Sequence, residues 1–100
     1  MDMYWVFYDA AYDEDVMETL EGCCVTGFTK WDRVLGKGPH AVPKMDNAVW
    51  PGYNCAVVVV ALDEESAHLR ASLLELRKKL GGRGMEIFRT GAERIEDEQV

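Results

Sequence analysis

The chain has 100 residues, a formal net charge of −7, 48% hydrophobic residues and 29% charged residues. This length supports one domain with a single small core, and the composition is that of a folded globular protein. The acidic charge argues against a dedicated binder of nucleic acid or of an anionic membrane. The longest apolar run (residues 56–62) is too short to span a membrane, and the N-terminus lacks signal-peptide features. We therefore expect a cytoplasmic protein that is not itself embedded in a membrane.

The first half of the chain predicts a strand, a helix and a second strand. Residues 3–8 are aromatic and β-branched, which is typical of a strand. Residues 11–21 place apolar side chains at helical spacing with acids in the first turn, and Gly22 is expected to end this helix. The second strand is expected over residues 24–35.

The second half predicts strand, helix and strand. Residues 54–62 form an apolar strand, Asp63 is expected to be the N-cap of a helix with a leucine stripe up to Leu80, and residues 85–89 form the last strand. The order is the ferredoxin-like βαββαβ arrangement, an α+β fold with a four-stranded antiparallel sheet.

The faces of the predicted sheet indicate self-association. Alternation puts Trp5 and Phe7 on one face of the first strand and Tyr4, Val6 and Tyr8 on the other, so this strand is apolar on both faces. Two helices can cover only one face of a four-stranded sheet. We therefore expect copies of the chain to cover the second face, although the C-terminal segment or a loop folding across it is the alternative.

Basic residues gather in two segments that also contain glycines. Residues 30–44 hold four bases against one acid, and residues 77–94 hold six bases against two acids. Glycine lets backbone N–H groups approach an anion closely, and a nearby Lys or Arg supplies charge. The two segments are therefore candidates for a small-anion site, while the simpler interpretation is that they are solvated surface.

Two motifs resemble those of PII signal-transduction proteins. The segment CVTGFTKWDRVLGKGPH (residues 24–40) resembles the PII second strand, in which glycine-x-threonine leads to glycine-x-glycine at the base of a long T-loop. The segment GGRGMEIF (residues 81–88) resembles the glycine-rich B-loop that enters the last strand. The resemblance implies ligand-binding roles for Gly27, Thr29, Gly36, Lys37, Gly38, Gly82, Arg83, Gly84 and Arg89.

The resemblance also implies a biological role. It implies a homotrimer with inward-facing sheets and clefts between subunits that bind an adenine nucleotide or a similar anion. The protein would be a non-enzymatic regulator that controls a membrane transporter, an efflux pump or a cytosolic enzyme through its loop. The domain would span residues 1–95, with a T-loop equivalent at 37–53 and a disordered acidic tail at 96–100.

The chain departs from the PII pattern at several positions. The connection at residues 38–53 is shorter than a full T-loop. Tyr53 adjoins the third strand, so covalent modification of a tyrosine at the loop tip is not carried over. Met85 and Glu86 stand where PII proteins favour a basic residue, which weakens triphosphate binding. Trp50 and Tyr53 are expected either to dock a partner or, for Trp50, to pack on the protein itself.

A metal-responsive protein, linked to heavy-metal tolerance or efflux, is the alternative function. His40, Cys55 and Met45 are the candidate ligands and would suit a soft metal, but no C-x-x-C or H-x3-H motif supports them. The three cysteines are expected to be reduced thiols.

An enzyme is the weaker third class. Small ferredoxin-like oligomers include heme-degrading monooxygenases and isomerases, but the chain has no Ser-His-Asp order, G-x-S-x-G motif or Walker A motif. We therefore expect no enzymatic activity and no covalent cofactor.

Overall fold

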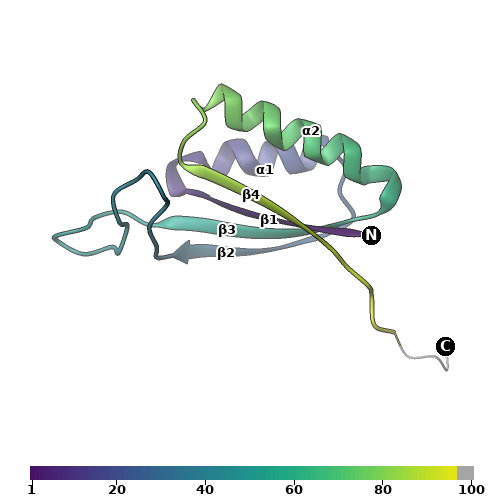
Figure 1. Cartoon of the computed structure of the whole chain (residues 1–100), viewed down its shortest axis with the longest axis horizontal. Helices are drawn as coiled ribbons and strands as arrows, with labels where there is room; N and C mark the ends of the chain where they lie inside the picture. The colour runs from purple at the N-terminus through teal and green to yellow at the C-terminus, as the bar shows by residue number, and fades with distance from the viewer. Residues whose placement is uncertain (97–100) are drawn as a thin grey trace.

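The computed structural model describes residues 1–96 and contains one four-stranded antiparallel sheet with two helices (Figure 1). The strand order is β2-β3-β1-β4, which confirms the predicted ferredoxin-like arrangement. None of the helices within residues 1–96 is long and apolar enough to cross a membrane. The elements are β1 (Asp2–Asp9), the 3₁₀ turn η1 (Ala10–Tyr12), α1 (Asp13–Gly22), β2 (Phe28–Val34), β3 (Asn54–Ala61), α2 (Asp63–Lys79) and β4 (Met85–Gly91).

The core lies between the sheet and the two helices, which cover the same face of the sheet in Figure 1. The first strand contributes every second residue to it, as its alternation predicts. Both helices add apolar side chains from their inner faces. The fully buried side chains of this core include Tyr4, Val6, Tyr8, Val16, Leu20, Val57, Val59, Leu69, Leu73 and Met85.

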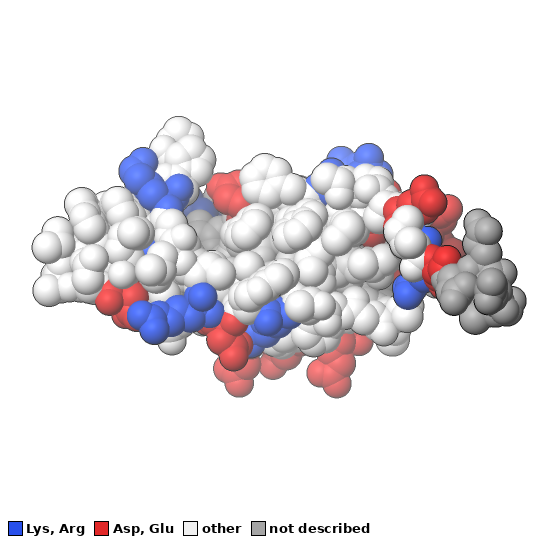
Figure 2. Space-filling view, turned by 90° about the horizontal axis from the view of Figure 1, so that it is seen from below, with Lys and Arg blue, Asp and Glu red and all other residues white. Residues whose placement is uncertain are grey.

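The opposite face of the sheet is apolar and uncovered by described residues. Trp5 pairs with Val58 on one side and Phe88 on the other, so these three residues share this face. The rings of Phe7 and Phe88 meet edge to face at 6.3 Å. Figure 2 shows this face as a continuous uncharged area with Lys, Arg, Asp and Glu at its margins. Phe88 is 56% exposed and Trp31 is 45% exposed, which is unusual for such large apolar side chains on a sheet.

Two expected boundaries are wrong. The second strand begins at Phe28 and not at residue 24, because Cys24 adopts φ 52° and donates its backbone N–H to the Glu21 carbonyl, which closes the end of α1. Asp63 is the first residue of α2 and not its N-cap. Leu62 is the N-cap, and its backbone N–H donates to the Glu65 carboxylate at 2.8 Å.

Other ends shift by one or two residues. The segment 10–12 forms η1 because the Asp9 side chain accepts from the Ala11 N–H, so α1 begins at Asp13. Gly22 is the last residue of α1, and Cys23 follows as its C-cap. The last strand continues to Gly91, which pairs with Asp2. The third strand ends one residue early, at Ala61.

A polar network joins α1 to the sheet. The Tyr8 hydroxyl donates to the Asp13 carboxylate at 2.7 Å, and the Lys30 ammonium donates to the other oxygen of Asp13 at 2.8 Å. Lys30 also pairs with Asp32 at 2.9 Å. Partial burial favours the neutral acid, but the hydrogen bonds from Lys30 and Tyr8 together lower the pKa of Asp13. Burial and the hydrogen bond to Asp13 raise the pKa of Tyr8.

This network predicts an acid-sensitive contribution to stability. A carboxylate whose pKa is lowered by folding stabilises the native state above its unfolded pKa of about 3.9, and this stabilisation is lost as the pH falls through the lower folded value. We expect Asp13→Asn to reduce the free energy of unfolding at pH 7 by about 1 kcal/mol and to lose less stability than the unaltered chain between pH 5 and pH 2. Urea unfolding across this range measures both effects.

Glu14→Gln is the matched control, because Glu14 is exposed and forms no ion pair within residues 1–96. It should leave the acid-induced loss unchanged. An equal loss in the Asp13→Asn and unaltered proteins would show that Asp13 does not contribute through its charge.

Candidate functional site

The loop between β2 and β3 has its own internal structure. Gly36 and Lys44 exchange two backbone hydrogen bonds of 2.9 and 2.7 Å, which close residues 36–44 into an inner ring. Residues 45–52 form an outer hairpin, in which the Met45 and Asp46 N–H groups donate to carbonyls of Trp50 and Gly52. In Figure 1 the two parts extend beyond the same end of the sheet. The long connection is therefore a folded two-part loop.

A glycine turn, residues 81–84, joins α2 to β4. The Gly82 N–H donates to the Arg77 carbonyl at 2.8 Å and the Gly81 N–H to the Lys78 carbonyl at 3.0 Å, a Schellman arrangement that ends the helix. Gly84 adopts φ 74°, and a Cβ atom there would lie 2.9 Å from the Tyr12 ring. Its carbonyl accepts the Asp9 N–H at 2.8 Å. These requirements explain why glycine occupies the turn.

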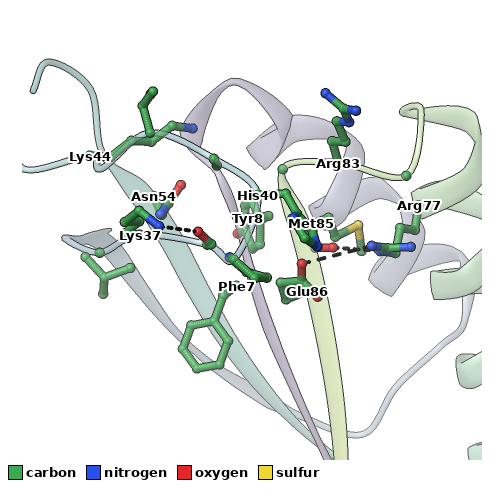
Figure 3. Close-up of a pocket in the computed structure, with 18 of the residues that line it drawn as sticks. Phe7, Tyr8, Lys37, His40, Lys44, Asn54, Arg77, Arg83, Met85 and Glu86 are labelled. Atoms are coloured by element: carbon green, nitrogen blue, oxygen red, sulfur yellow. Dashed lines mark hydrogen bonds and ion pairs between the residues drawn. The ribbon is translucent and has the colours of Figure 1, made fainter.

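The inner ring and the glycine turn face each other across one pocket with a volume of about 510 Å³ (Figure 3). Two glycine-containing segments that are far apart in the sequence thus line the same pocket within one chain. Figure 3 places Lys37 and Lys44 on one side and Arg77 and Arg83 on the other. Apolar side chains complete the walls: Phe7, Val34, Leu35, Pro39, Val42, Met85 and Phe88.

The four cations of the pocket are not equivalent. Lys44 pairs with Asp9, and Arg77 donates to the Met85 carbonyl at 2.8 Å and lies 4.0 Å from the Glu86 carboxylate. Within residues 1–96, the Lys37 ammonium makes only a long 3.5 Å contact with the Gly38 carbonyl. Arg83 is exposed, and neither it nor Lys37 pairs with a carboxylate in residues 1–96. Lys37 and Arg83 can therefore pair with an anionic ligand without breaking an existing ion pair.

The backbone of the pocket differs in part from the expected cradle. Gly36 and Gly82 were expected to offer N–H groups to a ligand, but the Gly36 N–H donates to Lys44 and the Gly82 N–H caps α2. Among the described residues, no partner occupies the N–H groups of Lys37, Gly38, Arg83 and Gly84. Each turn thus retains two adjacent N–H groups beside one uncommitted cation.

Three expected ligand-binding residues lie outside this pocket. Thr29 is the second residue of β2 and Gly27 immediately precedes the strand, so both lie at the opposite end of the sheet from the loop. Arg89 pairs across β1 with Tyr4, and its guanidinium lies 3.7 Å from the Asp2 carboxylate. A single chain therefore brings six of the nine expected residues together and leaves these three apart.

The residues expected to dock a partner or to bind a metal lie in the β2–β3 loop or at the start of β3. Trp50 and Tyr53 are 40% and 39% exposed. His40 lines the pocket, whereas Cys55 is buried on the helix-covered face and donates to the Asp32 carbonyl at 3.2 Å. Met45 is 42% exposed. No group of three or more His, Cys, Asp or Glu side chains in residues 1–96 is arranged to hold a metal ion.

Sequence reasoning assigned no role to Lys44, Arg77 and Asp9. Lys44 was visible only as one base in the first basic segment, and Arg77 only as a favourable charge near a helix C-terminus. Asp9 follows the first strand, where an acid is unremarkable. Their significance comes from the β1–β4 pairing and from the ring closure at Gly36 and Lys44, which depend on the tertiary structure.

Solved structures with the same fold include PII-like proteins. CPII from Thiomonas intermedia K12, described as a nitrogen regulatory PII-like protein bound to ADP, AMP and bicarbonate, aligns with a TM-score of 0.69 at 14% identity over 89% of this chain and 82% of CPII. Its apo form gives 0.65 at 12% identity, over 89% and 85% of the two chains. A DUF3240 family protein from Shewanella baltica OS155 gives 0.71 at 11% identity, over 96% and 93%.

These alignments establish that the chain has the PII-like ferredoxin fold, as the sequence resemblance predicted. No protein-family model matches the sequence, and no curated protein matches it either.

The glycine turn predicts a position-specific effect of an added methyl group. Gly84→Ala would place a Cβ against Tyr12 in a left-handed backbone conformation, so we expect a loss of about 1–3 kcal/mol in the free energy of unfolding. Gly91→Ala is the matched control, because no atom of the described chain lies within 4 Å of a Cβ placed there. Denaturant unfolding of the two variants measures the difference. Equal stability would show that the turn does not require glycine at position 84.

Proposed function

We propose that this chain is a non-enzymatic PII-like regulatory protein that binds an adenine nucleotide or a similar phosphorylated ligand between its two glycine segments. The observation that carries the proposal is the convergence of the inner ring and the glycine turn on one pocket with a basic rim and apolar walls. An adenine nucleotide has the matching chemistry, because its phosphates are anionic and its base has an apolar face.

The pocket offers distinct groups to the two ends of such a ligand. Lys37 and Arg83, with the N–H groups of their turns, would hold phosphate oxygens, since charge-assisted hydrogen bonds to phosphate are strong. Figure 3 shows the Arg83 side chain projecting from its turn, and its exposure leaves it free to reach inward. Phe7, Val34 and Leu35 would contact the base. CPII, which has the same fold, is described as bound to ADP and AMP, and this supports an adenine nucleotide as the class of ligand.

The charge balance favours a short phosphate chain. Lys44 and Arg77 already contact carboxylates, and Glu86 adds a negative charge to the pocket wall. The four cations outnumber the Asp9 and Glu86 carboxylates by two, whichever group each cation pairs with, and this excess matches one or two phosphates better than three, in line with the Met85–Glu86 departure from the PII pattern. We therefore propose a nucleoside mono- or diphosphate as the preferred ligand class.

We also propose that three copies associate through their uncovered sheet faces. Phe7 and Phe88 belong both to that face and to the pocket wall, so copies packed there would border the pocket and make it an intersubunit cleft. Thr29 lies on the uncovered face, as its pairing with Val58 indicates, and Gly27 is near it. In the assembly these two residues would be presented to a neighbouring subunit.

We propose that the protein contacts its regulatory target through residues 37–53 of the single domain 1–95. The outer hairpin exposes Val49 and Trp50, and Tyr53 is exposed at its base. Exposed apolar and aromatic side chains on a projecting hairpin are suited to docking a partner protein. We propose that the hairpin contacts a membrane transporter, an efflux pump or a cytosolic enzyme. Of the tail at 96–100, residues 97–100 lie outside the described part of the chain.

Charge reversal at the two uncommitted cations tests the site. Lys37→Glu combined with Arg83→Glu should weaken ADP and AMP binding at least tenfold, because each charged hydrogen bond to phosphate contributes roughly 1.5–3 kcal/mol. Isothermal titration calorimetry with ADP and AMP measures the change. Thermal denaturation with each nucleotide gives a second readout, since a ligand of the native state raises the midpoint.

The control makes the same change in net charge elsewhere. Arg70→Glu with Lys78→Glu reverses two exposed cations of α2 that do not line the pocket. This control should bind ADP within about twofold of the unaltered chain, because neither side chain lines the pocket. Undiminished affinity in the Lys37/Arg83 variant would refute the assignment of the site.

A further inference from the structure

Lys44 belongs both to the pocket and to the loop. Its side chain lines the pocket, while its backbone closes the inner ring through two hydrogen bonds with Gly36. The next residue, Met45, begins the outer hairpin, with its N–H donating to the Trp50 carbonyl. A movement of Lys44 would therefore displace both the inner ring and the outer hairpin.

Asp9 ties Lys44 to the glycine turn. Its carboxylate pairs with the Lys44 ammonium and also accepts the Ala11 N–H, and its backbone N–H donates to the Gly84 carbonyl at 2.8 Å. The side chains of Lys44 and Asp9 are 21% and 35% exposed, so the ion pair is partly shielded from water. Burial alone would favour the neutral acid, but the hydrogen bonds from Lys44 and the Ala11 N–H outweigh it and lower the pKa of Asp9.

We propose that Lys44 and Asp9 form a latch that an anionic ligand in the pocket opens by competing with Asp9 for Lys44. The proposal rests on the proposed function and names the regulation of that same site. With the pocket empty, Asp9 holds Lys44 and fixes the loop against the end of β1. With a phosphate in the pocket, Lys44 turns to the ligand, and the outer hairpin loses its ionic anchor to the sheet.

The coupling between ligand binding and opening of the latch determines whether each variant should bind the ligand more tightly or more weakly. If the ligand must take Lys44 from Asp9, part of its binding energy is spent on opening the latch, so removing the Asp9 charge should increase affinity. Removing the Lys44 charge should decrease affinity, because the ligand loses a cation. Both changes should loosen the loop without ligand. The two variants should therefore change ligand affinity in opposite directions while both loosen the loop. A simple structural ion pair would not give this combination.

Asp9→Asn is the informative variant. Asparagine keeps a side-chain oxygen for the Ala11 N–H and leaves the backbone bond to Gly84 in place, so the end of β1 should stay intact. Without ligand, we expect faster hydrogen exchange in residues 44–53 of this variant, measured by mass spectrometry. Unchanged exchange would overturn the latch whatever the ligand proves to be.

The ligand arm uses ADP as the probe. ADP should accelerate hydrogen exchange of residues 44–53 in the unaltered chain and cause no further change in Asp9→Asn. The Asp9→Asn variant should bind ADP about three- to tenfold more tightly than the unaltered chain.

Lys44→Met should bind ADP more weakly than the unaltered chain. Adding Asp9→Asn to Lys44→Met should increase ADP affinity by less than Asp9→Asn does alone. Glu86→Gln is the control, because it removes a pocket carboxylate but should leave loop exchange unchanged.

The outcomes separate the two proposals. If ADP, AMP and pyrophosphate all fail to bind the unaltered chain, both the proposed function and the ligand-driven latch are wrong. If ADP binds but loop exchange does not respond, or if Asp9→Asn does not tighten binding, the site stands and the latch is wrong. An acceleration of loop exchange by Glu86→Gln equal to that by Asp9→Asn would also overturn the latch, because it would reflect general electrostatics.

Discussion

The uncovered apolar face of the sheet is the constraint on which the other features depend. Two helices bury Tyr4, Val6 and Tyr8 beneath them, and no described segment covers Trp31 or Phe88 on the other side. Exposed apolar area of this kind carries a free-energy cost of about 25 cal/mol per Å² relative to burial. Association of copies removes that cost without any change in the fold of each chain.

The pocket lies where this face meets the loop end of the sheet. Phe7 and Phe88 belong to both, so assembly and ligand binding would share the same side chains. Asp9, at the end of the same strand, contacts the glycine turn through its backbone and the inner ring through Lys44. One strand end thus connects three features: the face that copies would cover, the pocket that a ligand would fill and the loop that a partner would contact.

The sequence was sufficient to predict the fold, and six of the nine residues that it grouped as ligand-binding line one pocket in the single chain. Strand alternation, helical spacing and glycine placement are local signals, and each is readable because its physical cause lies within a few residues. The start of β2 was misjudged because Cys24 takes a left-handed conformation that its residue type does not announce. The Gly36 N–H was assigned to a ligand because its partner, Lys44, is identified only by the folded loop. The Gly82 N–H was assigned to a ligand although its bond to the Arg77 carbonyl is a local motif that ends a helix.

The Lys44–Asp9 pair shows the same limit more clearly. The two residues are far apart in the sequence, and neither forms a motif. Their contact requires the β2–β3 loop to fold back on β1, which is a property of the ring closure and not of any local pattern. Gly27, Thr29 and Arg89 present the opposite case, since the resemblance grouped them with the pocket but the single chain keeps them apart.

Sedimentation equilibrium of the unaltered chain at micromolar concentration tests the central claim most directly. If copies close over the apolar face, the measured mass should be that of three copies of the 11.3 kDa chain. A stable single protomer at that concentration would contradict the account, because the face would then be tolerated in water and the pocket would have no neighbouring subunit.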